Sequence, residues 1–412
     1  MMEFNKYLNT RSWRYFKILL LVYVFYSMNC WVFFNANAMM MRFAYLFLAI
    51  PFFLKTSFWD TSQSRVGIAL LLAVLYVYCS GTGNLNLYIF SLIGALPLIS
   101  IVLLKDEYIL DLLESFQKIL YPLLALGAAF WILHLVGYDL PSTEVTFGTV
   151  LDSDGNVETQ YYFSNHYLYL VDNSALMRWN ADIPSFFRFS SIFIEPGYLG
   201  IMLTFLLFIN KFDINEKRNI VYIVSLVLTL SLAGFIMSLF AYIANRLAMS
   251  RNKVSTLIVI GVVVMFAYVF FSNYNDGNNA INEAIISRLE VDEEKGFAGN
   301  NRTSEALDDQ FAELLSSSDL LFGMSARDNI EFGVGYKAFM MRNGLFGLVL
   351  FLWFLTTIAK RADNYSSWIL FLLYVLMFAR GDVTMFWTAF IMVYVGGVTR
   401  TTYKTYKSAC RR

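Results

Sequence analysis

The stretch Arg188-Phe-Ser-Ser-Ile-Phe-Ile-Glu-Pro-Gly-Tyr-Leu-Gly200 lies where a long polar segment runs into an apolar one. Pro196 disfavours a helical conformation of Glu195, and its fixed φ suits the first position of a helix. The stretch therefore predicts a helix that begins at Pro196, with the Glu195 carboxylate near the positive end of the helix dipole. Gly197 and Gly200 keep the first turn slim, so that another group can approach its backbone.

Two interpretations of Glu195 remain open. A carboxylate at a water–lipid boundary, seven residues after Arg188, is a candidate functional group, because ionisable residues at membrane depth often mark function. The alternative is a helix cap preceded by an ordinary loop arginine. Spacing alone does not separate them.

Composition sets the class of protein. The chain has 412 residues, of which 58% are hydrophobic and only 15% are charged, whereas soluble domains carry about 25% charged residues. We therefore expect an all-α polytopic integral membrane protein with one domain, residues 1–412. A net charge of zero gives no reason to expect a nucleic-acid partner. Cys30, Cys79 and Cys410 are too far apart in sequence to indicate a metal motif or a disulfide.

Apolar runs predict about twelve membrane-spanning helices. They lie at residues 18–34, 40–54, 66–80, 85–104, 119–137, 195–210, 254–271, 344–358, 366–379 and 383–399, with two more short ones inside 219–244. Residues 1–17 are predicted to be an interfacial tail. Residues 106–116 have helical periodicity, which predicts a separate short helix on the cytoplasmic face.

Charge sets the orientation. If Ser231-Leu-Ala-Gly234 breaks residues 219–244 into two spans, most of the 31 Lys and Arg residues fall on one side, as the positive-inside rule requires. This predicts cytoplasmic termini and two large outer loops, residues 138–191 and 272–343. The first loop contains strand-like runs at Tyr161–Phe163 and Tyr167–Leu170. The second contains an amphipathic helix, Glu305–Leu315, with Leu307, Phe311, Leu314 and Leu315 on one face.

Several cations remain on the outer side against the usual bias, which suggests an anionic ligand there. They include Arg178, Arg188, Arg302, Arg327, Lys337 and Arg380. The planar fork of arginine suits phosphate oxygens, and a polyprenyl diphosphate carries its diphosphate at headgroup level. For Arg288, Lys295 and Arg342 we favour a solvated loop cation.

Other chemistries lack a pattern. The acids at 290–294 form a charge run without a ligand loop, and we interpret them as a solvated face. No His/Cys constellation indicates zinc, and the two histidines, His134 and His166, are interpreted as packing residues. The sequence therefore predicts no metal site and no cofactor.

Several motifs together resemble the Wzy-type oligosaccharide repeat-unit polymerases of bacterial O-antigen and capsule. They are Arg188 with the Glu195-Pro-Gly segment, the Ser231-x-x-Gly234 break, Arg302 followed by an amphipathic helix and Leu321-Phe-Gly323, and Asn343-Gly-Leu-Phe-Gly347. The match in topology covers nearly the whole chain, and the sequence match covers a small part of it. One departure is that Arg188 and Gly200 are separated by eleven residues, where the family motif has ten, so that motif is not carried over.

The resemblance implies a glycosyltransferase at the outer face of the bacterial inner membrane. Its donor and acceptor would be undecaprenyl-diphosphate-linked oligosaccharides, and a chain-length regulator protein would be a further partner. Glu195 would act as the base or orient the acceptor. Arg188 and Arg302 would hold the departing diphosphate. Arg178, Arg327, Lys337 and Arg380 would assist, and Tyr198 would stack on a sugar.

Two alternatives are kept. One is an O-antigen ligase, which shares this architecture. Ligases resemble a protein with an important histidine in the second large loop, whereas that loop of this chain contains no histidine. A lipid-linked oligosaccharide flippase is expected to carry charges within several spans and to have short outer loops. The nearly charge-free spans and two large loops of this chain favour the polymerase.

Overall fold

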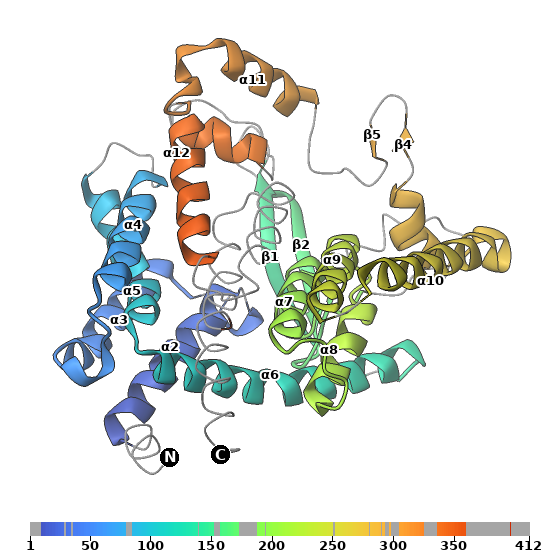
Figure 1. Ribbon diagram of the computed structural model, residues 1–412, viewed down its shortest axis with the longest axis horizontal. Helices are drawn as coiled ribbons and strands as arrows, with labels where there is room; N and C mark the ends of the chain where they lie inside the picture. Colours follow the sequence, from blue (N-terminus) through green and yellow to red (C-terminus); the bar gives the residue numbers. More distant parts are fainter. Residues whose placement is uncertain are drawn as a thin grey trace. The chain divides into compact units, whose positions relative to one another are not determined.

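The structure, a computed structural model, describes residues 10–28, 30–33, 36–79, 85–138, 140–151, 157–172, 188–193, 195–249, 252–279, 281–289, 291–292, 296–297, 305–324, 336–359 and 396. These residues are mostly helical (Figure 1). The chain forms two compact units. Unit 1 comprises residues 1–27, 35–116 and 301–412, and unit 2 comprises residues 28–34 and 117–300.

The described part of unit 1 is mostly helical. Its helices are α2 (Arg11–Ser27), α3 (Ala38–Phe53), α4 (Gln63–Cys79), α5 (Leu85–Leu103), the first part of α6 (Asp106–Leu135), α11 (Glu305–Ser316) and α12 (Tyr336–Ala359), with the short helices η2 (Thr56–Phe58) and η7 (Ser318–Leu320). The predicted spans at 40–54, 66–80 and 85–104 therefore correspond to real helices. The predicted spans at 366–379 and 383–399 lie outside the described residues, except for Gly396.

Residues 11–17 of the predicted interfacial tail are helical and pack into the core of unit 1. Helix α2 begins at Arg11, and Trp13 and Phe16 are fully buried. The indole Nε1 of Trp13 donates a hydrogen bond of 2.7 Å to Asp111, and Lys17 pairs with the same carboxylate. Amphipathic spacing, with aromatics on the buried face, explains why this segment packs against its neighbours.

Helix α6 corrects a second prediction. Residues 106–135 form one 30-residue helix, not a short surface helix followed by a separate span. Gln117 and Lys118, which separate the two apolar patterns, are good helix formers and do not break the helix. Pro122 lies inside it, and such prolines are tolerated in apolar helices whose freed carbonyls find other partners.

Unit 2 combines helices with two small sheets. Its elements are η1 (Trp31–Phe33), the second part of α6, β1 (Thr143–Leu151), β2 (Val157–Asn165), β3 (Leu170–Asp172), α7 (Pro196–Ile209), α8 (Lys217–Leu228), α9 (Leu232–Met249), α10 (Lys253–Asn273), η4 (Tyr274–Gly277), η5 (Asn282–Ile286), η6 (Ser287–Leu289), β4 (Val291–Asp292) and β5 (Gly296–Phe297). The all-α prediction therefore holds for the apolar segments but not for the loops.

The first large loop carries an antiparallel sheet in the order β1-β2-β3, visible in Figure 1 as a long hairpin. Thr143 pairs with Asn165 and Leu151 with Val157. The strand-like run at 161–163 lies in β2, as predicted. The run at 167–170 does not continue as a strand, because Tyr167 has a positive φ of 67° and begins a tight turn.

The chain reverses between α8 and α9, as predicted from the break at residues 231–234. At one end of α7, Asn210 donates a 2.8 Å hydrogen bond to Asn219 of α8. At the other end, a Cβ added to Gly200 would lie 3.1 Å from Ser231, which follows α8, so these helices are antiparallel. Past the break, the Oγ1 of Thr204 on α7 donates to the carbonyl of Gly234 on α9 at 3.2 Å, and Phe212 contacts Tyr242 further along. Helix α9 therefore runs parallel to α7.

The Ser231-x-x-Gly234 spacing has a physical reason. Ser231 caps α9 by accepting a 3.2 Å hydrogen bond from the amide of Gly234. Gly234 lets α7 approach, since a Cβ added there would lie 3.1 Å from the Cα of Gly200. Small residues at such crossings are typical of helix packing in membranes.

We expect Gly234→Leu to lower the stability of the protein by about 1–3 kcal/mol, as overpacking of a tight contact usually does. The measurement is the thermal unfolding midpoint in detergent. Gly261→Leu on α10 is the matched control, because no atom lies within 4 Å of a Cβ added there. Equal midpoints for the two variants would contradict the tight α7–α9 crossing.

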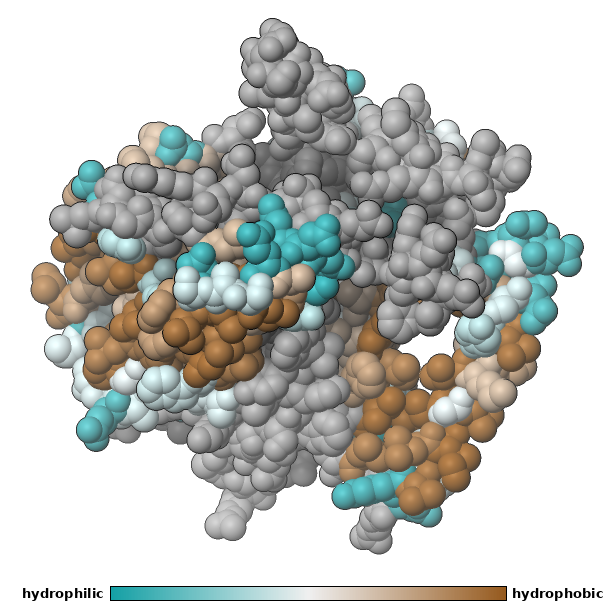
Figure 2. All heavy atoms as spheres, turned by 90° about the horizontal axis from the view of Figure 1, so that it is seen from above, coloured by the Kyte–Doolittle hydropathy of each residue, from teal (hydrophilic) through white to brown (hydrophobic). Residues whose placement is uncertain are grey.

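Three helices in the described part of the chain are long and apolar enough to span a membrane. They comprise residues 106–135, 253–277 and 336–358. The second, which contains α10, buries none of its apolar window, and Met265 and Phe266 are about two-thirds exposed. Figure 2 shows broad apolar areas on the surface. Such surfaces are those expected of a protein in a lipid environment.

Candidate functional site

Residues 188–193, which lead into α7, are built into unit 2. Phe189 and Ser191 are fully buried, and Phe189 packs edge-on against Trp131 of α6 with ring centres 5.9 Å apart. Ile192 accepts a 3.0 Å backbone hydrogen bond from Trp31. The residues that lead to the Glu-Pro-Gly segment are therefore part of the packed core of unit 2.

Arg188 lies at the carboxyl end of α8. Its Nε donates a 3.0 Å hydrogen bond to the carbonyl of Thr229, and the backbone amide of Phe189 donates to Leu228. The negative end of a helix attracts a cation, so α8 helps to fix this guanidinium. The guanidinium is therefore held in place beside the start of the Glu195 segment.

Glu195 is the N-cap of α7, as predicted, with Pro196 at the first helical position. Its backbone is extended, with φ −125° and ψ 127°, and its carbonyl accepts from the amides of Tyr198 and Leu199. Its carboxylate makes no capping hydrogen bond to the helix. The cap interpretation therefore explains the backbone of this residue, and the positive end of the helix dipole favours its charge.

The remaining predicted residues fall into two groups. Tyr198 is half-buried in the first turn of α7, within the same unit as Arg188 and Glu195. Lys337, in unit 1, pairs with Asp308 of α11 at 2.7 Å and lies over the ring of Phe311. Its charge is thus already matched. Arg178, Arg302, Arg327 and Arg380 lie outside the described residues.

In unit 1 the structure brings together two motifs that are separate in the sequence. Leu321-Phe-Gly323 packs against Asn343-Gly344, where α12 kinks. Met324 donates a 2.7 Å backbone hydrogen bond to Met341, and Phe346 donates to Leu321. Gly323 and Gly344 both have positive φ, and a Cβ on either would lie within 2.6 Å of the other segment's backbone. Both glycines are therefore required by this contact.

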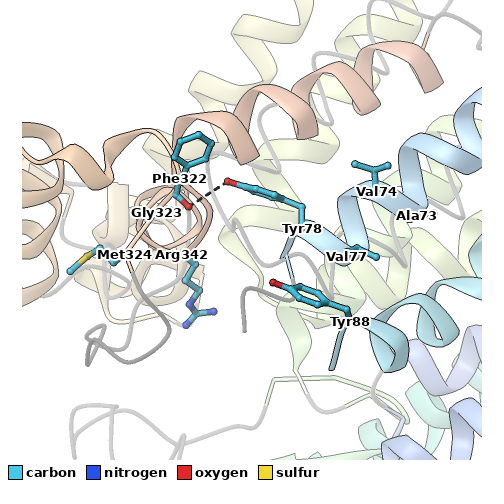
Figure 3. A pocket seen from close by; sticks show the side chains of 9 residues that line it. All are labelled: Ala73, Val74, Val77, Tyr78, Tyr88, Phe322, Gly323, Met324 and Arg342. Atoms are coloured by element: carbon cyan, nitrogen blue, oxygen red, sulfur yellow. Dashed lines mark hydrogen bonds between the residues drawn. The ribbon is translucent and has the colours of Figure 1, made fainter. Parts of the chain in front are cut away.

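Beside this contact lies a pocket of about 650 Å³. Its walls come from α4, α5, α12 and the turn after η7, and they consist of Ala73, Val74, Val77, Tyr78, Tyr88, Phe322, Gly323, Met324 and Arg342. Figure 3 shows the Arg342 guanidinium and the Tyr88 ring on facing sides. The hydroxyl of Tyr78 donates a 2.8 Å hydrogen bond to the carbonyl of Asn343, which ties α4 to α12. The pocket is apolar, with one cation.

Arg342 corrects an interpretation made from the sequence. It is exposed, as a solvated loop cation would be, but it belongs to helix α12 and lines this pocket. The signal available in the sequence was its position, one residue before the Asn-Gly pair at which the chain enters an apolar span. Tyr78 and Tyr88 were missed because their proximity to Arg342 depends on contacts between distant segments.

Among the described residues, no group of three or more His, Cys, Asp or Glu side chains is placed to hold a metal ion. Comparisons with protein-family models, with curated proteins and with solved structures find no match. The Glu195 segment of unit 2 and the Arg342 pocket of unit 1 are therefore the two candidate sites.

Proposed function

We propose that this protein is a membrane glycosyltransferase that polymerises oligosaccharide repeat units linked to undecaprenyl diphosphate, at the outer face of a bacterial inner membrane. The product would be O-antigen or capsular polysaccharide. The observation that supports this most directly is the pocket lined by Arg342, Tyr78 and Tyr88, because it combines apolar walls with a cation.

The lining of this pocket suits an amphiphilic anion. Val74 and Val77 offer apolar surface to a polyprenyl chain, whereas the Arg342 guanidinium can bind phosphate oxygens in a bidentate manner. The opposite end of α4 carries Arg65, which is buried and pairs with Asp60 and Asp106. Under the positive-inside rule the Arg65 end is cytoplasmic, so the Tyr78 end of α4 would face outward.

The reaction needs a group that removes a proton from a sugar hydroxyl and groups that stabilise the departing diphosphate. In our proposal Glu195 does the first, because it is a carboxylate at the N-terminus of α7, in the same unit as Arg188. Arg188, held at the end of α8, and Arg302 stabilise the diphosphate. Arg342 binds the lipid-linked substrate. Tyr198 offers a ring for a sugar to stack on.

The proposed orientation predicts which surface residues an impermeant thiol reagent reaches in intact cells. Ser142→Cys and Asn278→Cys should react from outside, and Asn215→Cys and Asn252→Cys should react only after permeabilisation. All four positions are exposed in the structure. Labelling of Asn252→Cys from outside would mean that the α8–α9 reversal does not return the chain to the cytoplasm, and the proposed topology would be wrong.

The cellular product separates the proposed function from its alternatives. Deletion of the gene should leave surface lipid carrying a single repeat unit, which is the product expected when polymerisation alone is lost. Core lipid without any repeat would instead indicate a ligase. Accumulation of lipid-linked repeats on the cytoplasmic side would indicate a flippase.

A further inference from the structure

The only two histidines of the chain lie together in unit 2. His134 is in the last turn of α6, and His166 follows β2, yet their ring centres are 5.3 Å apart. Tyr169, which is fully buried, stacks on His166 with ring centres 4.8 Å apart and an interplanar angle of 12°. Three rings from two segments, α6 and the turn after β2, therefore form one cluster.

The position of His166 is fixed by the backbone around it. The amide of Tyr167 donates a 2.7 Å hydrogen bond to the side chain of Asn165, and the indole of Trp31 donates to the carbonyl of Tyr167. The carbonyl of Leu168 lies against Gly127 of α6, where a Cβ would stand 2.6 Å from it. Since Gly127 is seven residues before His134 on α6, this contact sets the distance between the two histidines.

His166 has an unmet bonding requirement. The residue is buried, with only 9% of its surface exposed, and its Nδ1 makes no hydrogen bond to any atom of the described residues. A buried ring nitrogen without a partner is costly unless a ligand meets it. Stacking on Tyr169 orients the ring but does not satisfy the nitrogen.

The spacing of the two rings matches a pair of metal ligands. Zinc–imidazole bonds are about 2.0–2.1 Å, and with about 1.2 Å from nitrogen to ring centre, two imidazoles on a tetrahedral ion have centres about 5.2 Å apart. The observed spacing is 5.3 Å. Imidazole suits zinc, copper and nickel, whereas magnesium and calcium prefer oxygen ligands.

We propose that His134 and His166 form a two-histidine binding site for zinc or another borderline divalent transition metal, which fastens the turn after β2 to α6. Water or an incoming ligand completes the coordination. The site is separate from the Arg342 pocket and does not depend on the proposed polymerase activity. It also gives a role to the two residues that sequence alone presents as packing residues.

The test uses the full-length protein in detergent, purified with an affinity tag that contains no histidine, because the chain itself has only two. Zinc titration should show one ion per chain. With Cu²⁺ as the probe, the electron paramagnetic resonance spectrum should show splitting from two imidazole nitrogens, which distinguishes this site from the cysteines. His134→Ala and His166→Ala should each weaken zinc binding by about tenfold or more, since even loss of an outer-shell partner costs 10–100-fold.

Gly127→Ala tests the geometry without removing a ligand. The added methyl should displace Leu168 and weaken zinc binding, whereas Gly261→Ala on α10, which meets nothing within 4 Å, should leave it unchanged. Size-exclusion elution and circular dichroism report whether each variant is folded. Absence of zinc binding to the folded wild type, or equal binding by the His134→Ala and wild-type proteins, would overturn the proposal.

Discussion

Replacing Glu195 by glutamine should lower the rate of glycan polymerisation by about 10²–10⁴, the usual effect of removing a proton-transfer group. The substitution keeps the shape of the side chain and removes its charge. Stability should change by less than about 1 kcal/mol, because glutamine keeps the shape of the side chain and a charge at a helix N-terminus contributes about 0.3–1 kcal/mol. The measurement is the initial rate of chain elongation at equal amounts of purified protein.

Glu216→Gln is the matched control for this variant. Glu216 is the N-cap of α8, also has extended backbone, and also makes no capping hydrogen bond to its helix through its side chain. Its carboxylate instead accepts from Arg218 at 2.6 Å. We expect near wild-type elongation from it. If Glu195→Gln produces full-length ladders at the wild-type rate, then Glu195 has only a structural role at the start of α7.

Replacing Arg342 by alanine should lower kcat/KM for the lipid-linked donor by about 10–100-fold. Hydrogen bonds to charged groups contribute about 1.5–3 kcal/mol, which corresponds to that range. Arg342→Lys should recover only part of the loss, because an ammonium cannot reproduce the bidentate fork. Initial rates as a function of donor concentration give both parameters.

Arg246→Ala is the control for the loss of an exposed arginine. Arg246 lies near the end of α9, where its guanidinium rests on Tyr242, and we place it on the cytoplasmic side. It should not change kcat/KM. If Arg342→Ala behaves like Arg246→Ala, then the pocket in unit 1 does not bind the lipid-linked donor.

The features that were correctly predicted are local ones. Pro196 directly after Glu195 specifies where α7 begins, because the conformational limits of proline act on its immediate neighbours. The α8–α9 reversal was signalled by Ser231 and Gly234, whose cap and close approach act within one turn. The charge pattern added the direction in which each segment was expected to run.

The features that were missed depend on contacts between distant segments. The continuity of α6 was missed because an acidic first half and an apolar second half suggest two environments, whereas no residue between them breaks the helix. The 5.3 Å spacing of His134 and His166 requires α6 and the turn after β2 to meet at Gly127. The proximity of Arg342 to Tyr78 requires α4 to pack on α12. The hydrophobic periodicity of the sequence does not reveal these contacts between distant segments.

The central claim is that this chain alone joins lipid-linked repeat units. The most direct measurement incubates the purified protein with a synthetic repeat unit on undecaprenyl diphosphate and resolves the products by size. We predict a ladder that grows by one repeat per step, with release of undecaprenyl diphosphate, and no ladder from Glu195→Gln on the same time scale. Unchanged substrate in the presence of folded wild-type protein, or transfer of a single repeat only to added lipid A-core, would contradict the claim.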